Sequence, residues 1–205
     1  MALRSYGTPK IYLPPIERYQ RVIQACNQDN NTLDLEYYPG SPWIATALTR
    51  NMDRLNFCEL HPRESDTLAR NFQQDHRIKQ FHRDGFQTAI ATMPPKERRG
   101  LVLIDPPYEV KQDYDRVVEV LIACHKRFAT GTYAIWYPVV KRQTIQKMLK
   151  NIQHSGMIVI NPPWTLWQAM KESLPFLAKQ LGGGGQGQRI KNNLLNKQVM
   201  RHSFI

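Results

Sequence analysis

The amino-acid sequence predicts an α/β protein in three layers, with helices on both faces of a largely parallel sheet. Short apolar runs typical of strands alternate with helical periods along most of the chain. Acidic residues follow several of these runs directly, at the points where parallel sheets bind ligands. With 205 residues, the chain is long enough for one domain with a sizeable core.

Two helices are expected first. Residues 12–27 have a helical period, preceded by the Pro14-Pro15 pair, with apolar residues at Ile16, Tyr19, Val22, Ile23 and Cys26. The alternating run from Leu33 to Tyr38 predicts a strand, and the Pro/Gly-rich turn after it feeds a second helix that continues to Leu48. Ser41 is predicted to cap this helix.

Four strand-like runs follow, at residues 54–60, 78–82, 101–105 and 133–137. Helical periods are found at 64–74, 114–128 and 141–151. The sequence therefore predicts one α/β domain over residues 1–181. Residues 182–205 begin with a glycine-rich stretch and continue as a basic tail, which predicts a flexible linker and an extended end.

The charge balance indicates a polyanionic partner. The chain has 28 Lys+Arg against 17 Asp+Glu, a formal net charge of +11, which favours nucleic acid. The basic run Lys96, Arg98 and Arg99 is either a solvated face or a set of phosphate contacts. Three cysteines at unrelated spacings predict no disulfide framework, and the histidine spacing predicts no metal site. The absence of a long apolar run or signal-peptide core predicts a cytoplasmic protein.

Acidic residues at three strand ends indicate a nucleoside cofactor. They are Glu59, Asp84 with Gly85, and Asp105. A carboxylate after one strand can accept both ribose hydroxyls, and a carboxylate after the next can accept an adenine amino group. The alternative for each acid taken singly is a helix N-cap.

The turn Asp105-Pro106-Pro107-Tyr108, after the apolar run that begins at Leu101, predicts methyl transfer to a nucleobase amine. The lone pair of such an amine is delocalised into the ring. If Asp105 accepts one N–H and the Pro106 carbonyl accepts the other, the lone pair is directed at an electrophile. Tyr108 would stack on the base. Alternatively, the prolines only end a strand and Asp105 only caps a helix.

A second turn of the same shape competes with it. Asn161-Pro162-Pro163-Trp164 follows the run Met157 to Ile160, and an amide oxygen can also accept a hydrogen bond. The strand end Trp136-Tyr137-Pro138 offers aromatic rings that either wall a base pocket or belong to the core.

Six motifs in order resemble the RlmJ-type adenine-N6 methyltransferases of bacterial large-subunit ribosomal RNA, from about Tyr37 to Leu181. They are Tyr37-Tyr38-Pro39-Gly40-Ser41-Pro42, Glu59-Leu60-His61-Pro62, Asp84-Gly85-Phe86, Leu103-Ile104-Asp105-Pro106-Pro107-Tyr108, Trp136-Tyr137-Pro138 and Ile160-Asn161-Pro162-Pro163-Trp164.

The resemblance implies a Rossmann-like methyltransferase sheet and an S-adenosylmethionine-dependent enzyme that methylates an adenine in 23S rRNA. It implies that Ser41, Glu59, Asp84 and Gly85 contact the cofactor and that Asp105 is the catalytic carboxylate, near both cofactor and base. Catalytic roles for Pro106 and Tyr108 are expected instead from the hydrogen bonding of the amine and the stacking of the base described above. In the family's motif order Asn161 belongs to a later structural turn.

The chain departs from the family pattern in three places. The family's first strand, which ends in an Asp-x-His-Ala-Gly-x-Gly-like loop, is not recognisable here. The strands ending at Glu59 and Asp105 are therefore expected to expose unpaired edges. The stretch from Lys141 to Ser155 is too short for the usual helix and antiparallel strand, so a late strand is also not recognisable. Met200 to Phe204 resembles the family's beginning, at the other end of the chain.

The leading hypothesis is thus an enzyme that methylates 23S rRNA, in protein-free or early assembly form, as a cytoplasmic monomer without a metal. Two alternatives stay open. One is DNA adenine-N6 methylation, since the same turn serves both polymers. The other is a non-catalytic, RNA-binding remnant of the fold.

Overall fold

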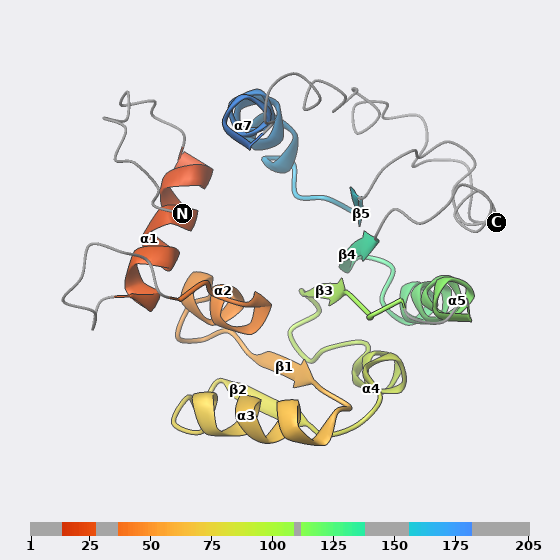
Figure 1. The fold of residues 1–205 in the computed structure, drawn as a ribbon. Coiled ribbons are helices and arrows are strands. Elements are labelled where there is room, and N and C mark those ends of the chain that lie inside the picture. The colour runs from red at the N-terminus through yellow and green to blue at the C-terminus, as the bar shows by residue number, and fades with distance from the viewer. Residues whose placement is uncertain (1–13, 28–36, 109–111, 138–155, 182–205) are drawn as a thin grey trace. The chain divides into compact units, whose positions relative to one another are not determined.

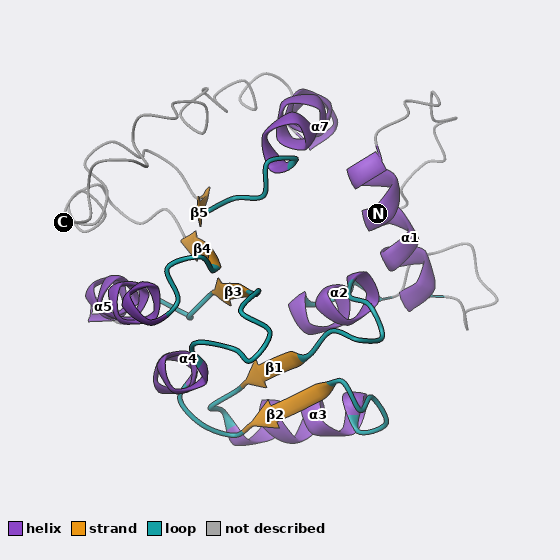
Figure 2. Ribbon diagram, turned by 180° about the vertical axis from the view of Figure 1, so that it is seen from behind, coloured by secondary structure: helices purple, strands orange, loops and turns teal. Residues whose placement is uncertain are grey.

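The computed structural model describes residues 14–27, 37–108, 112–137 and 156–181. The chain forms two compact units. One unit, here called the sheet unit, comprises residues 54–163, and the other, here called the helical unit, joins residues 1–53 with 164–205. Figure 1 shows the order of the elements, and Figure 2 shows them by secondary structure. The predicted boundary at residue 181 stays a prediction, since residues 182–205 lie outside the described part.

The helical unit contains α1 (Pro14–Cys26), α2 (Ser41–Leu48) and α7 (Leu166–Leu181), and α1 contacts both of the others. The first two confirm predicted helices. Pro14 and Pro15 are the first two residues of α1 and do not precede it. Proline is tolerated there because the N–H groups of the first helical turn have no partner within the helix.

The predicted cap of α2 is wrong. Gly40 is the N-cap, no side chain caps the helix, and Ser41 is its exposed first residue. The strand expected from Leu33 falls largely in residues 28–36, outside the described residues. Tyr37 and Tyr38 are described and have no strand structure.

Among its described residues, the sheet unit contains five strands and three helices. The strands are β1 (Leu55–Cys58), β2 (Ile78–Phe81), β3 (Leu101–Ile104), β4 (Thr132–Tyr137) and β5 (Gly156–Ile160). The helices are α3 (Pro62–Phe72), α4 (Gly85–Thr92) and α5 (Gln112–Arg127). The four predicted strands and two of the three predicted helices are confirmed. The third predicted helix, 141–151, lies outside the described residues.

The strands form two sheets. β1 pairs with β2 in parallel, β3 pairs with β4 in parallel, and β5 lies antiparallel on the other side of β4. Among the described strands, none pairs with the remaining edge of β1 or of β3. Within the described residues these edges are thus unpaired, and their exposure in the whole chain stays a prediction. The antiparallel strand β5 directly precedes Asn161, whereas residues 141–155 are not described.

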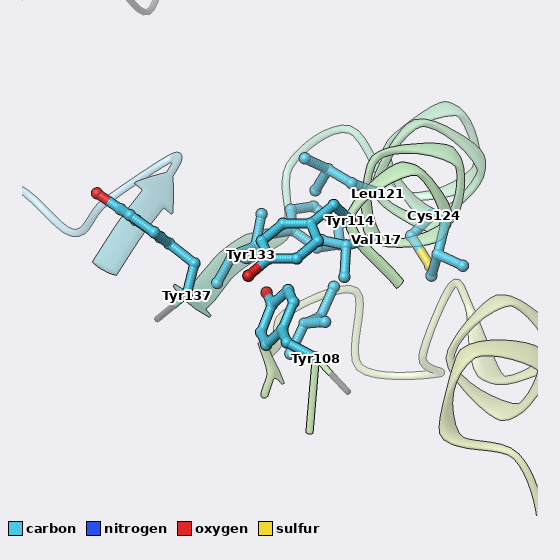
Figure 3. Packing of buried hydrophobic residues seen from close by; sticks show 10 residues of the cluster. Tyr108, Tyr114, Val117, Leu121, Cys124, Tyr133 and Tyr137 are labelled. Atoms are coloured by element: carbon cyan, nitrogen blue, oxygen red, sulfur yellow. The ribbon is translucent and has the colours of Figure 1, made fainter. Parts of the chain in front are cut away.

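The main core lies between α5 and one face of β3 and β4 (Figure 3). Tyr133, Ile135, Val117 and Cys124 are its fully buried residues. Burying a large apolar side chain contributes about 1.5–3 kcal/mol, so this contact dominates the stability of the sheet unit. On the opposite face, apolar side chains are exposed on all three strands; they are Leu101, Leu103, Trp136 and Met157.

α4 joins the two sheets of the unit. It follows β2 and packs against α5, and Phe86, Ile90 and Met93 contact the main core. None of the helices in the described residues is both long and apolar enough to cross a membrane.

Candidate active site

The turn from Asp105 to Tyr108 begins at the carboxyl end of β3. Ile104, the last residue of β3, lies opposite Ile135 in the parallel pair, so Asp105 follows at the level of Trp136. The Asp105 side chain is exposed at this edge, and no described residue donates a hydrogen bond to its carboxylate. Partial burial raises the pKa of Asp105. The carboxylate is thus a somewhat better proton acceptor than an ordinary surface aspartate.

Tyr108 anchors the other end of the turn. Its backbone has a φ of 53°, a left-handed conformation that is uncommon for a bulky residue. The hydroxyl donates to the Trp136 carbonyl at 2.6 Å, and the ring lies 4.7 Å from that of Tyr114. Burial raises the pKa of Tyr108, so the phenol stays protonated and keeps this bond. These contacts hold the two prolines, and with them the Pro106 carbonyl, in one position.

Trp136 has an exposed ring close to this turn. Its ring centre lies 6.4 Å from that of Tyr108, and 38% of the residue is exposed, whereas Tyr137 is buried. The core interpretation is therefore right for Tyr137 and wrong for Trp136. The predicted stacking of a base on Tyr108 stays a prediction, and Trp136 offers a second aromatic surface beside it.

Glu59 lies at the carboxyl end of β1. Its N–H donates to the Phe81 carbonyl at 3.1 Å, continuing the β1–β2 pairing, and its Oε1 accepts from the His61 N–H at 2.8 Å. That bond satisfies a backbone donor just before α3, but the N-cap of this helix is His61, so Glu59 is not the helix N-cap that the alternative expected. Because β1 and β2 are parallel, Glu59 shares its edge of the sheet with the residues that follow β2.

Asp84 caps α4 and also makes an ion pair. Its Oδ1 accepts from the N–H groups of Phe86 (2.8 Å) and Gln87 (3.3 Å), and its Oδ2 pairs with Arg116 of α5. Burial acts to raise the pKa of Asp84, but the Arg116 guanidinium and the two backbone N–H groups outweigh it and hold the pKa below its usual value. The carboxylate is therefore ionised and held in one orientation.

Gly85 is the first residue of α4, and a Cβ there would lie 3.5 Å from the Cys58 Cβ, an ordinary contact. Packing alone therefore does not require glycine at this position.

Arg116 is the site residue that sequence reasoning misses. It bonds Asp84, and its guanidinium lies 4.7 Å from the Phe86 ring centre. One signal was available, because Arg116 is the first basic residue of a helix that begins with two acids, Asp113 and Asp115. This ion pair connects α5, the helix after the Asp105 turn, to the loop that follows β2.

Asn161 lies at the other end of the sheet. Ile160 pairs with Tyr133 near the start of β4, whereas Asp105 is at the level of Trp136. At 3.3 Å per residue the two positions are roughly 10–13 Å apart along the strands. The Asn161 Nδ2 donates to the Ala129 and Gly131 carbonyls at 2.6 and 2.9 Å. The expected structural role of this turn is confirmed.

A cavity of about 220 Å³ lies at the same end of the sheet unit as Asn161. It is lined by Pro94, Arg98, Arg127, Phe128, Ala129 and Thr130. The described residues contain no group of three or more His, Cys, Asp or Glu that could hold a metal ion.

The structure places three predicted site residues, Glu59, Asp84 and Gly85, at the carboxyl end of the β1–β2 sheet and the fourth, Asp105, at the carboxyl end of β3. Glu59, Asp84 and Gly85 follow the paired strands β1 and β2, and Arg116 links Asp84 to the helix after Asp105. Ser41 belongs to the helical unit and is described there only as the exposed first residue of α2.

Comparison with known proteins gives consistent matches. A family model described as "Ribosomal RNA large subunit methyltransferase D, RlmJ" matches residues 12–156 and 150–193. Ribosomal RNA large subunit methyltransferase J of Haemophilus influenzae is 46% identical over 196 residues, covering 84% of this chain and 69% of the relative. The Escherichia coli protein of the same name is 43% identical over 196 residues, with the same coverage.

A crystal structure of a Legionella pneumophila protein, assigned to a family of unknown function, superposes with a TM-score of 0.75 and 32% identity. The match covers 87% of this chain and 72% of that protein. The family model matches well over half of the chain, and both relatives are more than 40% identical to it, so this chain belongs to the RlmJ family of ribosomal RNA large subunit methyltransferases.

Proposed function

We propose that this chain transfers a methyl group from S-adenosylmethionine to N6 of an adenine in 23S ribosomal RNA, and that the turn from Asp105 to Tyr108 performs the transfer. The observation that carries the proposal is the position of Asp105. Its carboxylate is exposed at the carboxyl end of a parallel strand and receives no hydrogen bond from the described residues, in a turn that Tyr108 holds rigid.

The mechanism follows from the hydrogen bonds that the Asp105 carboxylate and the Pro106 carbonyl can accept. The Asp105 carboxylate takes one N–H of the adenine amine and the Pro106 carbonyl takes the other, which moves the nitrogen lone pair out of the ring plane. The cofactor, when bound, supplies an electrophilic methyl group with a neutral leaving group. Asp105 therefore acts by orienting the amine, and its raised pKa helps it take up the proton after transfer.

The cofactor is assigned to the strand ends beside this turn. Glu59 supplies a carboxylate for ribose hydroxyls, and Asp84 with Gly85 supplies an acceptor for the adenine amino group of the cofactor. One oxygen of Glu59 is engaged by His61, and both oxygens of Asp84 are engaged. A carboxylate has about four lone-pair sites, so each still accepts further bonds. Ser41 is assigned to the same cofactor.

The net charge of +11 supports RNA as the partner, since a basic surface binds phosphates. We further propose that the substrate is 23S rRNA in protein-free or early assembly form and that the enzyme acts as a cytoplasmic monomer.

Replacing Asp105 by Ala tests the proposal. The variant should lose at least about 100-fold in methyl transfer, the usual contribution of a positioned acid or base, while its RNA affinity stays close to the parent's. The measurement is incorporation of labelled methyl into protein-free 23S rRNA. Asp66→Asn, at an exposed position on α3, is the matched control and should keep full activity.

Two results would reject parts of this proposal. An Asp105→Ala variant with most of its rate would place catalysis elsewhere. Comparable labelling of duplex DNA would remove the preference for rRNA. The interrupted sheet favours one alternative, the RNA-binding remnant, which would bind rRNA without transferring methyl groups.

A further inference from the structure

The Asp84 carboxylate accepts three bonds from described residues, and they are divided unequally between its two oxygens. Oδ1 accepts from the N–H groups of Phe86 at 2.8 Å and Gln87 at 3.3 Å, whereas Oδ2 accepts only from the Arg116 guanidinium. The two oxygens together have about four lone-pair sites. Oδ1 is therefore filled, and the acceptor site that remains for a ligand is on Oδ2, beside Arg116.

The two bonds to Oδ1 fix only half of the carboxylate. They hold this oxygen at the first turn of α4, as an N-cap does, but they leave the position of Oδ2 to a partner outside the helix. That partner is Arg116 of α5. The Asp84 side chain is 19% exposed, so the bond is shielded from much of the competing solvent. Arg116 thus determines the direction of the last acceptor site of Asp84.

Arg116 is itself held in place. Its guanidinium lies 4.7 Å from the Phe86 ring centre, and this ring packs against the main core. The next residue of α5, Val117, is fully buried in the same core, which anchors this part of the helix. A group that is fixed before a ligand arrives orients its partner at little further cost in entropy when the ligand binds.

We propose that Arg116 is a positioning residue for cofactor recognition, which makes the site select a cofactor with an adenine amino group by holding Oδ2 of Asp84. This inference rests on the proposed function, in which Asp84 accepts from that amino group. The amine donates to the remaining lone pair of Oδ2, while the guanidinium, which has only donors, occupies the other. A purine without the amino group leaves this charged acceptor unfilled, which is unfavourable in a partly buried site.

Paired ligands test the proposal. One is S-adenosylhomocysteine, the cofactor after it has lost its methyl group, and the other is its analogue with hydrogen in place of the 6-amino group. Calorimetry on the full 205-residue chain should show that the first binds about tenfold or more tightly than the second, as expected for a hydrogen bond to a charged group.

Arg116→Met should lose this preference. The variant should bind S-adenosylhomocysteine more weakly and the analogue as the parent does, so that the preference falls to about threefold or less, because an acceptor that is not held in position contributes little net binding. Arg116→Lys keeps the charge without the planar geometry and should restore part of the preference. It also serves as the test if the methionine variant does not fold.

Steady-state kinetics separate positioning from a general loss of structure. Arg116→Met should raise the KM for S-adenosylmethionine and leave kcat at saturating cofactor close to the parent's, as expected when only ground-state binding is lost. Lys126→Met, at an exposed position on the same helix, is the matched control and should change neither the ligand preference nor this KM.

The outcomes separate this inference from the proposed function. An Arg116→Met variant that loses the same factor in affinity for both ligands overturns the positioning role, while methyl transfer to 23S rRNA by the parent still supports the function. A parent that does not prefer the amino ligand, or that binds neither ligand, also overturns it. A preference that depends on Arg116, in a chain that transfers no methyl group to 23S rRNA, supports the inference and rejects the function.

Discussion

Tyr108 and Tyr114 are neighbouring buried tyrosines whose hydroxyls are in different situations. Tyr108 donates to the Trp136 carbonyl, whereas the Tyr114 hydroxyl is buried and has no hydrogen-bond partner among the described residues. The ring centres are 4.7 Å apart, and both residues belong to the main core. The pair therefore isolates the contribution of a single hydrogen bond to the active-site turn.

We expect opposite effects from removing the two hydroxyls. Tyr108→Phe leaves a carbonyl without its partner and releases the left-handed turn, which should cost about 1–3 kcal/mol of unfolding free energy. Tyr114→Phe removes an unpaired polar group and should be neutral or slightly stabilising. Urea denaturation of both variants is the measurement. An equal loss in both would show that ring packing rather than the Tyr108 hydroxyl holds the turn.

Single residues were predictable from the sequence where position along the chain decided their role. The placement of Asp105 after β3 and the structural role of Asn161 follow from strand ends and motif order. Arg116 was missed because its partner Asp84 is 32 residues away, and no local pattern links a helix surface to a distant strand end. The anchoring bond of Tyr108 was missed for the same reason.

At the scale of the elements, the turn after β5 is hydrogen-bonded to the start of β4 and to the residues just before it. Asn161 has a φ of 50°, donates through Nδ2 to two carbonyls before β4, and accepts through its backbone oxygen from the Thr132 hydroxyl at 2.8 Å. Asparagine tolerates this left-handed conformation better than most residues. The turn thus depends on both the backbone and the amide of one residue.

Two substitutions separate these contributions. Asn161→Gly keeps the conformation but loses the amide, and should cost about 1–3 kcal/mol of unfolding free energy. Asn161→Ala also loses the amide and adds strain of about 1 kcal/mol or more. The methyl-transfer rate of the folded fraction should be unchanged in both. A large fall in that rate with normal stability would assign Asn161 to catalysis.

The loop before β3 and the end of α5 together form a basic surface. Arg98 and Arg127 line the cavity at the edge of the sheet unit away from Asp105, and the Arg127 guanidinium is fixed by a 2.8 Å bond to the Ile90 carbonyl. Two guanidinium groups at one cavity fit a phosphate of the RNA backbone.

Arg98→Gln with Arg127→Gln should weaken rRNA binding and reduce the slope of log affinity against log salt by about one per arginine, as expected when phosphate contacts are lost. Affinity measured across a salt series is the test. Arg70→Gln, an exposed arginine on α3, is the control of equal charge change per residue. An unchanged slope in the double variant would make this surface a solvated face.

Element boundaries were predictable where apolar runs were long enough to show a period. The four strands and most helices satisfy this condition. α4 begins at Gly85, a predicted site residue, and no helix was predicted there, although α2 has the same length of eight residues and was predicted. The α2 cap was assigned to Ser41 because serine is a common cap, but the preceding Gly40 has the extended backbone of the cap position.

At the scale of the whole chain, the Asp84–Arg116 pair links the two halves of the interrupted sheet unit. Arg116 also stacks on Phe86, so the link combines charge with packing. Its ionic part depends on an Asp84 carboxylate whose pKa is lowered. Stability from this carboxylate is present above the ordinary aspartate pKa and is lost as pH falls through the lowered value.

Arg116→Met should therefore lower the thermal unfolding midpoint at neutral pH. The difference from the parent should shrink as pH falls from the ordinary aspartate pKa of about 3.9 through the lowered value of Asp84, because below that lowered value the carboxylate is protonated in the folded parent too. Calorimetric scans across this range are the measurement, with Arg70→Met as control. A difference that stays constant with pH would mean that packing on Phe86 supplies the whole link.

The interrupted sheet was predictable from the order of motifs, since a strand expected between two recognised ones was not found. The division into two units was not predictable, because it depends on contacts between residues 1–53 and 164–205, which are far apart in the sequence. The sequence indicates what each segment forms, and long-range contacts decide which segments share a core.

The Asp84–Arg116 pair also determines which substitutions this protein can accept at these two positions during evolution. Among the described residues Arg116 has one partner side chain for its charge, so lysine there keeps the sign but loses the guanidinium geometry and the stacking on Phe86. Asp84 has three partners, the guanidinium and two helix N–H groups, and a charge swap would leave arginine where an acceptor is needed. Substitutions should therefore accumulate more readily at position 116 than at position 84, although both residues belong to one ion pair.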